Sequence, residues 1–245
     1  MAKPLVARAR VRLQAAAPAR DHHPGGDESG GERGENREAD GGIHRRIVAS
    51  ASTGRNPNRA RGRRGGRDFD EAGWLAGARR VPSPNADARP PGTEVTLVVI
   101  HGISLPPGRF GGDAILDLFT NRLDPGLHPA FAPIASLRVS SHFLIRRDGT
   151  LVQFVPCAMR AWHAGASQWE GRERCNDFSI GIELEGTDLV PYTSRQYRRL
   201  ASLVRRLGKR WPVRDIAGHS DIAPGRKTDP GPAFDWARFR GLLAD

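Results

Sequence analysis

Two histidines and one aspartate in the second half of the chain could together bind a metal ion. His101 directly follows the apolar run 95–100, His219 lies in a loop-like segment, and Asp229 comes ten residues later. Two imidazoles and one carboxylate form a borderline-soft donor set that suits Zn²⁺, and three protein ligands leave the fourth position open for water. On spacing alone, however, such residues are more often ordinary hydrogen-bonded side chains.

Glu183 is a fourth candidate, because it is a polar residue in an otherwise apolar run. In residues 179–185, Ile180, Ile182 and Leu184 alternate with the two glutamates. This period of two predicts a strand with the three apolar side chains on one face and Glu183 on the other. Beside a bound metal ion, such a carboxylate would be the base that accepts a proton from water.

The apolar pattern predicts the strands that must position these residues. Residues 95–100 form a short β-branched run, which is typical of a buried central strand. Residues 141–145 and 151–155 flank the turn signal Arg147-Asp148-Gly149, so they are expected to form a hairpin.

Capping residues predict three helices. Thr193 and Gln196 have the spacing of a capping box, and apolar residues then recur at helical spacing as far as Leu207. Asp113 and Asp235 could each cap a shorter helix, ending near residues 119 and 243. The basic residues between 195 and 210 are interpreted as a solvated helix face rather than a binding site. Because strands and helices interleave without a regular βαβ repeat, we expect an α/β (α+β) fold with a central mixed β-sheet flanked by helices.

The first part of the chain differs in composition from the rest. Residues 1–68 are rich in glycine and charge and poor in large apolar side chains, so a disordered N-terminal extension is expected, followed by one folded domain over residues 69–245. The Arg-Gly run 61–66 could bind nucleic acid. A solvated tail, or translated sequence upstream of the natural start, is the alternative, and no nucleic-acid binding is expected of the folded domain.

Charge and cysteine content limit the binding surfaces and the cellular compartment that we expect for the protein. The net charge of +11 is divided about equally between the first 70 residues and the rest, so no single basic stripe accounts for it. The chain has only two cysteines, which favours two reduced thiols in a reducing compartment. The N-terminus lacks the apolar core of a secretory signal, and no stretch approaches the roughly 18 apolar residues of a membrane helix. We therefore expect a soluble, cytoplasmic protein that does not bind membranes.

Long collinear blocks add a family resemblance to this interpretation. Over about residues 73–240 the chain resembles the AmpD-type N-acetylmuramoyl-L-alanine amidases, within the larger amidase and peptidoglycan-recognition superfamily. The blocks are 73–75 with 78–84, 101–107, 160–165, 171–177, 179–187 and 218–240, the last containing Asp-Ile-Ala-Pro and Arg-Lys-Thr-Asp-Pro-Gly. In one departure, Gly102 stands where the family often has asparagine, which leaves a local hydrogen bond or substrate contact open.

The resemblance implies roles for eight residues. His101, His219 and Asp229 would bind zinc, Glu183 would be the catalytic carboxylate and Lys227 the catalytic lysine, while Arg138, Trp162 and Arg174 would contact the muropeptide. A surface ion pair is the alternative for each arginine, and a place in the core is the alternative for Trp162. His128, His142 and His163 are interpreted as structural histidines.

The resemblance also implies a reaction and a place for it. The enzyme would hydrolyse the amide between N-acetylmuramic acid and L-alanine in 1,6-anhydro-muropeptides, during peptidoglycan recycling in the cytoplasm. In bacteria with an inducible β-lactamase, removal of the muropeptide would also damp the induction signal. The alternatives are an exported amidase that acts on intact murein and a peptidoglycan-binding module without catalysis. The complete set of ligand residues argues against the binding module.

Overall fold

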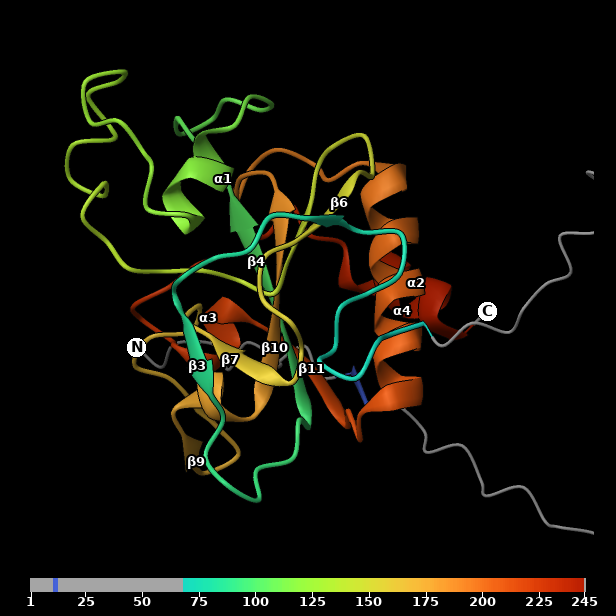
Figure 1. The fold of residues 1–245 in the computed structure, drawn as a ribbon. Helices are drawn as coiled ribbons and strands as arrows, with labels where there is room; N and C mark the ends of the chain where they lie inside the picture. The colour runs from blue at the N-terminus through green and yellow to red at the C-terminus, as the bar shows by residue number, and fades with distance from the viewer. Residues whose placement is uncertain (1–10, 13–67, 245) are drawn as a thin grey trace, which may run out of the picture. The chain divides into compact units, whose positions relative to one another are not determined.

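A seven-stranded mixed sheet forms the centre of the part of the chain described by the computed structural model, which covers residues 11–12 and 68–244. Figure 1 shows this sheet with helices on either side. The strands follow one another across the sheet in the order β1 (Val11–Arg12), β11 (Asp215–Gly218), β4 (Leu97–Ile103), β10 (Ser179–Glu185), β5 (Phe143–Ile145), β6 (Leu151–Gln153) and β2 (Arg79–Arg80).

The pairing directions confirm the predicted mixed sheet. β11, β4, β10 and β5 are parallel neighbours, whereas β6 pairs antiparallel with β5 as the predicted hairpin. β1 is antiparallel to β11, and β2 is parallel to β6. Two small antiparallel sheets lie outside this one, β3 (Ala86–Ala88) with β7 (Met159–Ala161) and β8 (Gln168–Trp169) with β9 (Arg172–Glu173).

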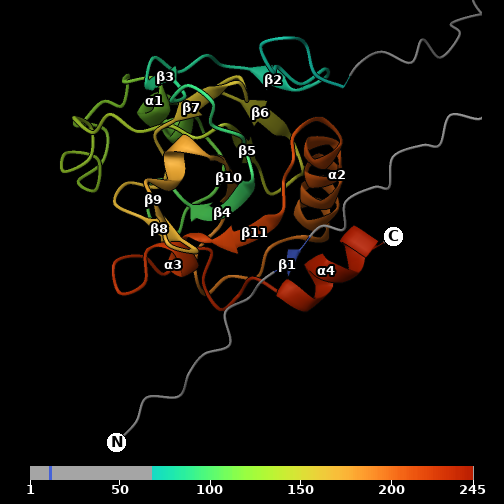
Figure 2. The same ribbon diagram turned by 90° about the horizontal axis from the view of Figure 1, so that it is seen from below.

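Both faces of the central sheet are covered, because parallel strands bury side chains on both sides. On one face Ile180, Ile182 and Leu184 join a core cluster with the apolar side of α2 (Ser194–Arg210) and with Phe239 of α4 (Trp236–Ala244). The other face carries α1 (Ala114–Phe119), the short α3 (His219–Ile222) and the two small sheets, as Figure 2 shows. A 3₁₀ turn at Cys175–Asp177 precedes β10.

The helix starts follow the predicted caps in two cases of three. Thr193 and Gln196 form the capping box of α2, and Asp235 accepts a hydrogen bond from the backbone nitrogen of Arg238 at 2.9 Å at the start of α4. Asp113 precedes α1 as predicted, but its side chain does not cap the helix. Its carboxylate instead accepts a hydrogen bond from Arg146 at 3.0 Å, because a guanidinium competes successfully with the backbone amides.

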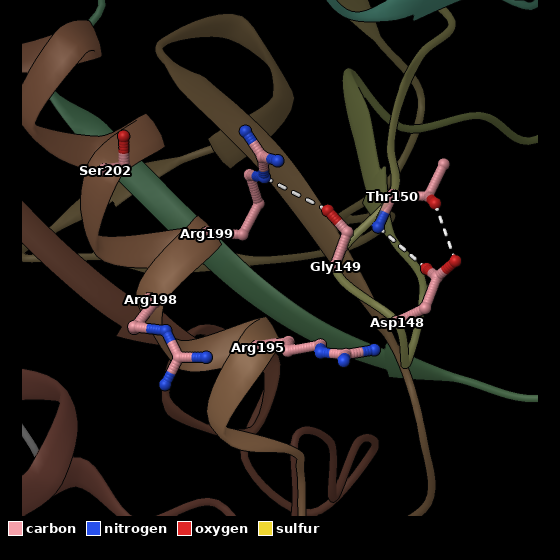
Figure 3. A pocket seen from close by; sticks show the side chains of 7 residues that line it. All are labelled: Asp148, Gly149, Thr150, Arg195, Arg198, Arg199 and Ser202. Atoms are coloured by element: carbon pink, nitrogen blue, oxygen red, sulfur yellow. Dashed lines mark hydrogen bonds between the residues drawn. The ribbon is translucent and has the colours of Figure 1, made fainter.

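The basic side of α2 borders a hollow of about 370 Å³ beside the turn of the β5–β6 hairpin. Figure 3 shows Arg195, Arg198 and Arg199 along the helix, with the Nε of Arg199 donating to the carbonyl of Gly149 at 3.0 Å. This contact ties the hairpin to the helix. The hollow contains no histidine and lies outside the cluster of candidate ligands.

The predicted disordered extension falls outside the described residues except at Val11, Arg12 and Asp68. Val11 and Arg12 form β1, which pairs antiparallel with Ile216 and Asp215 of β11. Asp68 forms an ion pair with Arg206 of α2 at 2.9 Å. None of the helices within 11–12 and 68–244 combines the length and apolar character needed to cross a membrane.

Candidate functional site

Three parallel strands bring the candidate residues to one edge of the sheet. In the pairing of β4 with β10, His101 lies opposite Glu183. Gly218, the last residue of β11, pairs with Ile100, so His219 begins α3 beside the same strand. The sequence predicted that His101 directly follows the strand. In the structure β4 begins two residues later than the apolar run and continues to Ile103, so His101 lies within the strand.

His101, His219 and Asp229, called the ligand set below, converge in space. The Nδ1 atoms of the two histidines are 2.9 Å apart, and they lie 3.3 and 3.1 Å from Oδ2 of Asp229. One possible ligand atom from each residue falls within 4.8 Å of the others. Both histidines are buried, and Asp229 is partly exposed at the pocket. The ligand residues predicted from the sequence are thus brought together.

Backbone contacts hold the loop that carries Asp229. The nitrogen of Ser220 donates to the carbonyl of Asp229 at 2.9 Å, and the nitrogen of Gly102 lies 3.4 Å from its Oδ2. The hydroxyl of Tyr192 donates to the carbonyl of Pro230 at 3.0 Å. The loop is therefore fixed both to β4, which carries His101, and to α3.

The protonation states of the ligand set suit the binding of a cation. Nε2 of His219 lies 3.2 Å from the carbonyl oxygen of Ala164, which can only accept, so a neutral ring keeps its proton there and presents a lone pair at Nδ1. Burial lowers the pKa of His101 to about 4, which leaves this ring neutral at pH 7. Neutral imidazoles and an ionised carboxylate are the ligands that Zn²⁺ prefers.

Glu183 lies in the same pocket, which has a volume of about 250 Å³ and is lined also by the ligand set and Lys227. Only 7% of Glu183 is exposed. Burial raises the pKa of Glu183 well above its usual value, the charge of Asp229 adds to this, and the ammonium of Lys227 opposes it. A carboxylate with a raised pKa is a stronger proton acceptor near neutral pH, so the geometry suits acid–base chemistry.

The remaining wall of this pocket is largely apolar. Side chains from β4, α1 and the segment before β5 form this wall, namely Ile103, Leu118, Phe119, Leu137 and Val139. An apolar wall with a few converging polar groups is typical of a site for an organic ligand.

The three predicted substrate contacts differ in position. Trp162 lines the pocket and is half-buried rather than part of the core, and its Nε1 donates to Asp87 at 3.2 Å. Arg138 is exposed and lines an adjoining hollow of about 230 Å³, which also contains Trp162 and Lys227. Arg174 lines a different hollow and forms an ion pair with Asp177 at 3.3 Å.

Two further residues at the site were not predicted from the sequence. Arg226 donates to the carbonyls of Ala164 and Ala166 at 2.7 and 2.6 Å, and it borders both the hollow of Arg138 and that of Arg174. His163 lies against His101, with Nδ1 2.9 Å from its Nε2. Their adjacency in sequence to Lys227 and Trp162 was the available signal. His142 is buried among hydrogen-bonding partners, as expected of a structural histidine.

Gly102 is in close contact with Tyr192. A Cβ atom at position 102 would lie 2.4 Å from the hydroxyl oxygen of Tyr192, which is far inside van der Waals contact. The next atom of that ring, Cζ, would lie at 3.7 Å, an ordinary contact. A side chain at position 102 would therefore require the ring of Tyr192 to shift.

Comparisons with known proteins point to one family. The model of the family described as N-acetylmuramoyl-L-alanine amidase matches residues 91–232. The 1,6-anhydro-N-acetylmuramyl-L-alanine amidase AmpD of Escherichia coli (strain K12) is 64% identical over 176 residues, which are 71% of this chain and 96% of that protein. The AmpD of Haemophilus influenzae is 50% identical over 172 residues, 69% of this chain and 94% of that protein.

Solved structures agree with this result. A crystal structure of a selenomethionine AmpD derivative has a TM-score of 0.69 at 60% identity and covers 71% of this chain and 98% of its own. The solution structure of Citrobacter freundii AmpD has a TM-score of 0.54 at 62% identity, over 71% of this chain and 94% of its own.

The contact between Gly102 and Tyr192 leads to a double-mutant prediction. Gly102→Ala should lower the free energy of unfolding by about 1–3 kcal/mol, because the added methyl overlaps the hydroxyl. In a Tyr192→Phe background the same substitution should cost little, because the overlapping atom is gone. Urea unfolding of the four proteins measures this difference. An equal cost of Gly102→Ala in both backgrounds would show that the hydroxyl is not the obstacle.

Proposed function

The chain belongs to the N-acetylmuramoyl-L-alanine amidase family and is an enzyme of the AmpD type, and on this premise we propose that it hydrolyses the amide between 1,6-anhydro-N-acetylmuramic acid and L-alanine in muropeptides. The observation that carries the proposal is the convergence of the ligand set with Glu183 in one pocket. The similarity to relatives named for this activity supports the substrate class.

The ligand set would hold one zinc ion. Two neutral imidazole nitrogens and a carboxylate oxygen fit it, and they leave room for a further ligand on the side of the pocket. When bound, zinc supplies Lewis acidity, which makes water a better nucleophile and an amide carbonyl a better electrophile. The protein residues around it then have to move protons and to bind the substrate.

Glu183 would carry the proton. Its carboxylate accepts a proton from the attacking water while the carbon–oxygen bond forms, and it returns that proton to the alanine nitrogen as the carbon–nitrogen bond breaks. The products are a muramic acid carboxylate and a peptide with a free amino terminus. Burial, which raises the pKa of Glu183, supports this role, because a carboxylate with a raised pKa is a stronger base toward water and holds the proton until the leaving nitrogen accepts it.

Lys227 and three residues at the rim would bind the substrate. The ammonium of Lys227 is the cation of the pocket that could stabilise the oxyanion of the tetrahedral intermediate. Arg138 could pair with a carboxylate of the stem peptide, and Trp162 between the two hollows could contact the sugar. Arg174 would reach the substrate only at its far end, along the hollow that Arg226 borders.

We assign the reaction to peptidoglycan recycling in the cytoplasm. Cys157 and Cys175 are both buried free thiols, and burial raises the pKa of each. Such unreactive thiols are compatible with a reducing compartment. An anhydro-muropeptide is a small soluble substrate, which fits a pocket of this size better than a polymer surface does.

Incubation with a purified anhydro-muropeptide tests the substrate and the bond together. Mass spectrometry should detect the anhydro-sugar with a free lactyl carboxylate and the intact stem peptide that begins with L-alanine. Cleavage within the peptide, or an unchanged substrate with zinc-loaded protein, would contradict the proposal. Intact sacculi are the comparison substrate, and they should release far less peptide.

A further prediction concerns the metal. The purified protein should contain about one zinc ion per chain, because the ligand set provides three protein donors. Treatment with a chelator should abolish hydrolysis and zinc should restore it, as followed by metal analysis and product formation. Full activity of the metal-free protein would eliminate the proposed chemistry.

Variants of Glu183 and Asp229 should separate proton transfer from metal binding. Glu183→Gln should lower kcat by roughly 10²–10⁴, because an amide cannot take the proton from water. Its zinc content should be unchanged, since the ligand set is intact. Asp229→Asn should instead weaken zinc binding, because it removes an anionic ligand.

Glu185→Gln is the matched control for Glu183→Gln. Glu185 lies on the same strand and is also buried, but its carboxylate accepts hydrogen bonds from the backbone nitrogens of Gly111 and Arg147 at 2.6 and 3.1 Å. This variant should lose stability and keep its kcat within a few-fold. If Glu183→Gln behaves in the same way, Glu183 has no part in the reaction.

A further inference from the structure

A line of hydrogen bonds leads from His101 through His163, which also lines the pocket, to Ser179 of β10 and away from the ligand set. Nδ1 of His101 faces His219 and Asp229, whereas its Nε2 lies 2.9 Å from Nδ1 of His163. Nε2 of His163 in turn lies 3.2 Å from the hydroxyl of Ser179, which donates to the carbonyl of Cys175 at 2.6 Å. We call these four groups the imidazole line.

The far end of the imidazole line sets the direction of every hydrogen bond in it. The carbonyl of Cys175 can only accept, so the single proton of the Ser179 hydroxyl is used there. The oxygen of Ser179 must then accept from Nε2 of His163, which leaves Nδ1 of His163 without a proton in the neutral ring. His101 consequently donates from Nε2, and its Nδ1 presents a lone pair to the ligand set.

The strand next to His163 is shaped to admit its ring. Gly181 lies in the middle of β10, where its backbone follows the regular pairing with β4. A Cβ atom at this position would lie 2.5 Å from Cγ of His163 and 2.7 Å from its Nδ1. The glycine is therefore required by the imidazole of His163 rather than by the backbone conformation of the strand.

The backbone of His163 is held as well. The side-chain oxygen of Asn176 accepts from the nitrogens of His163 and Ala164 at 3.1 and 2.8 Å. Ala164 also provides the carbonyl that faces Nε2 of His219 at 3.2 Å. One short segment thus carries the outer hydrogen-bond partners of both histidine ligands.

We propose that His163 is a positioning residue for the metal site, which fixes the tautomer and the ring orientation of His101 through the imidazole line. The inference rests on the proposed zinc site and adds a residue to it. A ligand histidine that donates from its second ring nitrogen is better oriented and more basic, and loss of such a partner typically lowers metal affinity about 10–100-fold.

Two substitutions of nearly equal shape test this role. In asparagine the side-chain oxygen is attached to Cγ, as Nδ1 is in histidine, so His163→Asn can still accept the proton of His101. His163→Leu has almost the same outline and no acceptor. Zinc affinity, measured by competition with a chromophoric chelator, should fall about 10–100-fold in His163→Leu and by a markedly smaller factor in His163→Asn.

The tautomer provides a readout that does not depend on activity. Long-range ¹H–¹⁵N spectra of the zinc-free wild-type protein should show the proton of His101 on Nε2. His163→Leu should shift this proton toward Nδ1 or leave a mixture of tautomers, and His163→Asn should restore the wild-type pattern. Thermal melting of each variant measures how far the substitution lowers the stability of the fold, separately from the tautomer of His101.

Each outcome supports or overturns the inference. Equal zinc affinity in His163→Leu and wild type, or equal losses in the leucine and asparagine variants, would reduce His163 to a packing residue. A wild-type His101 that carries its proton on Nδ1 would also overturn the imidazole line. If the wild type binds no zinc, the proposed function fails, but the spectra still test the imidazole line.

If His163→Leu does not fold, Ser179→Ala is the alternative variant. It removes the acceptor of the His163 proton, so it should change the His163 signals and weaken zinc binding a few-fold.

Discussion

The site depends on the parallel register of three neighbouring strands. Because β11, β4 and β10 run in the same direction, their carboxyl ends meet at one edge of the sheet, as is usual for sites in parallel sheets. The register places His101 opposite Glu183 and sets His219 one residue beyond the end of β11. A slip of one residue in β10 would turn Glu183 toward the α2 side and bring Ile182 or Leu184 to the metal ligands.

Two glutamates of β10 show how local partners divide structural from chemical roles. Glu183 and Glu185 share a face and are both buried. Two backbone amides occupy the carboxylate of Glu185, which therefore serves to join the loop before α1 to the hairpin turn. Glu183 lines the pocket and is influenced mainly by burial, by Asp229 and by Lys227. The alternation in the sequence groups the two residues together, and only their neighbours in space separate them.

Periodic elements and the ligand set could be predicted from the sequence, whereas elements and contacts fixed by distant residues could not. β10 and α2 have enough residues to show a clear period, and both were predicted with their observed limits or caps. β11 has four residues and no alternation, and it is a strand only because β4 lies beside it. Asp113 has the sequence of a cap, but Arg146, far along the chain, takes its carboxylate. His163 was assigned a structural role because nothing in the sequence places it next to His101.

The close contact between Gly102 and Tyr192 has an evolutionary consequence. The hydroxyl of Tyr192 occupies the space that a side chain at position 102 would need, and it also supports the loop of Asp229 through Pro230. A side chain at position 102 would meet the hydroxyl of Tyr192, and loss of that hydroxyl would remove its hydrogen bond to Pro230. Among homologues the two positions should therefore vary together, with glycine accompanying a large hydroxyl-bearing ring and a longer side chain at the first position accompanying a smaller residue at the second.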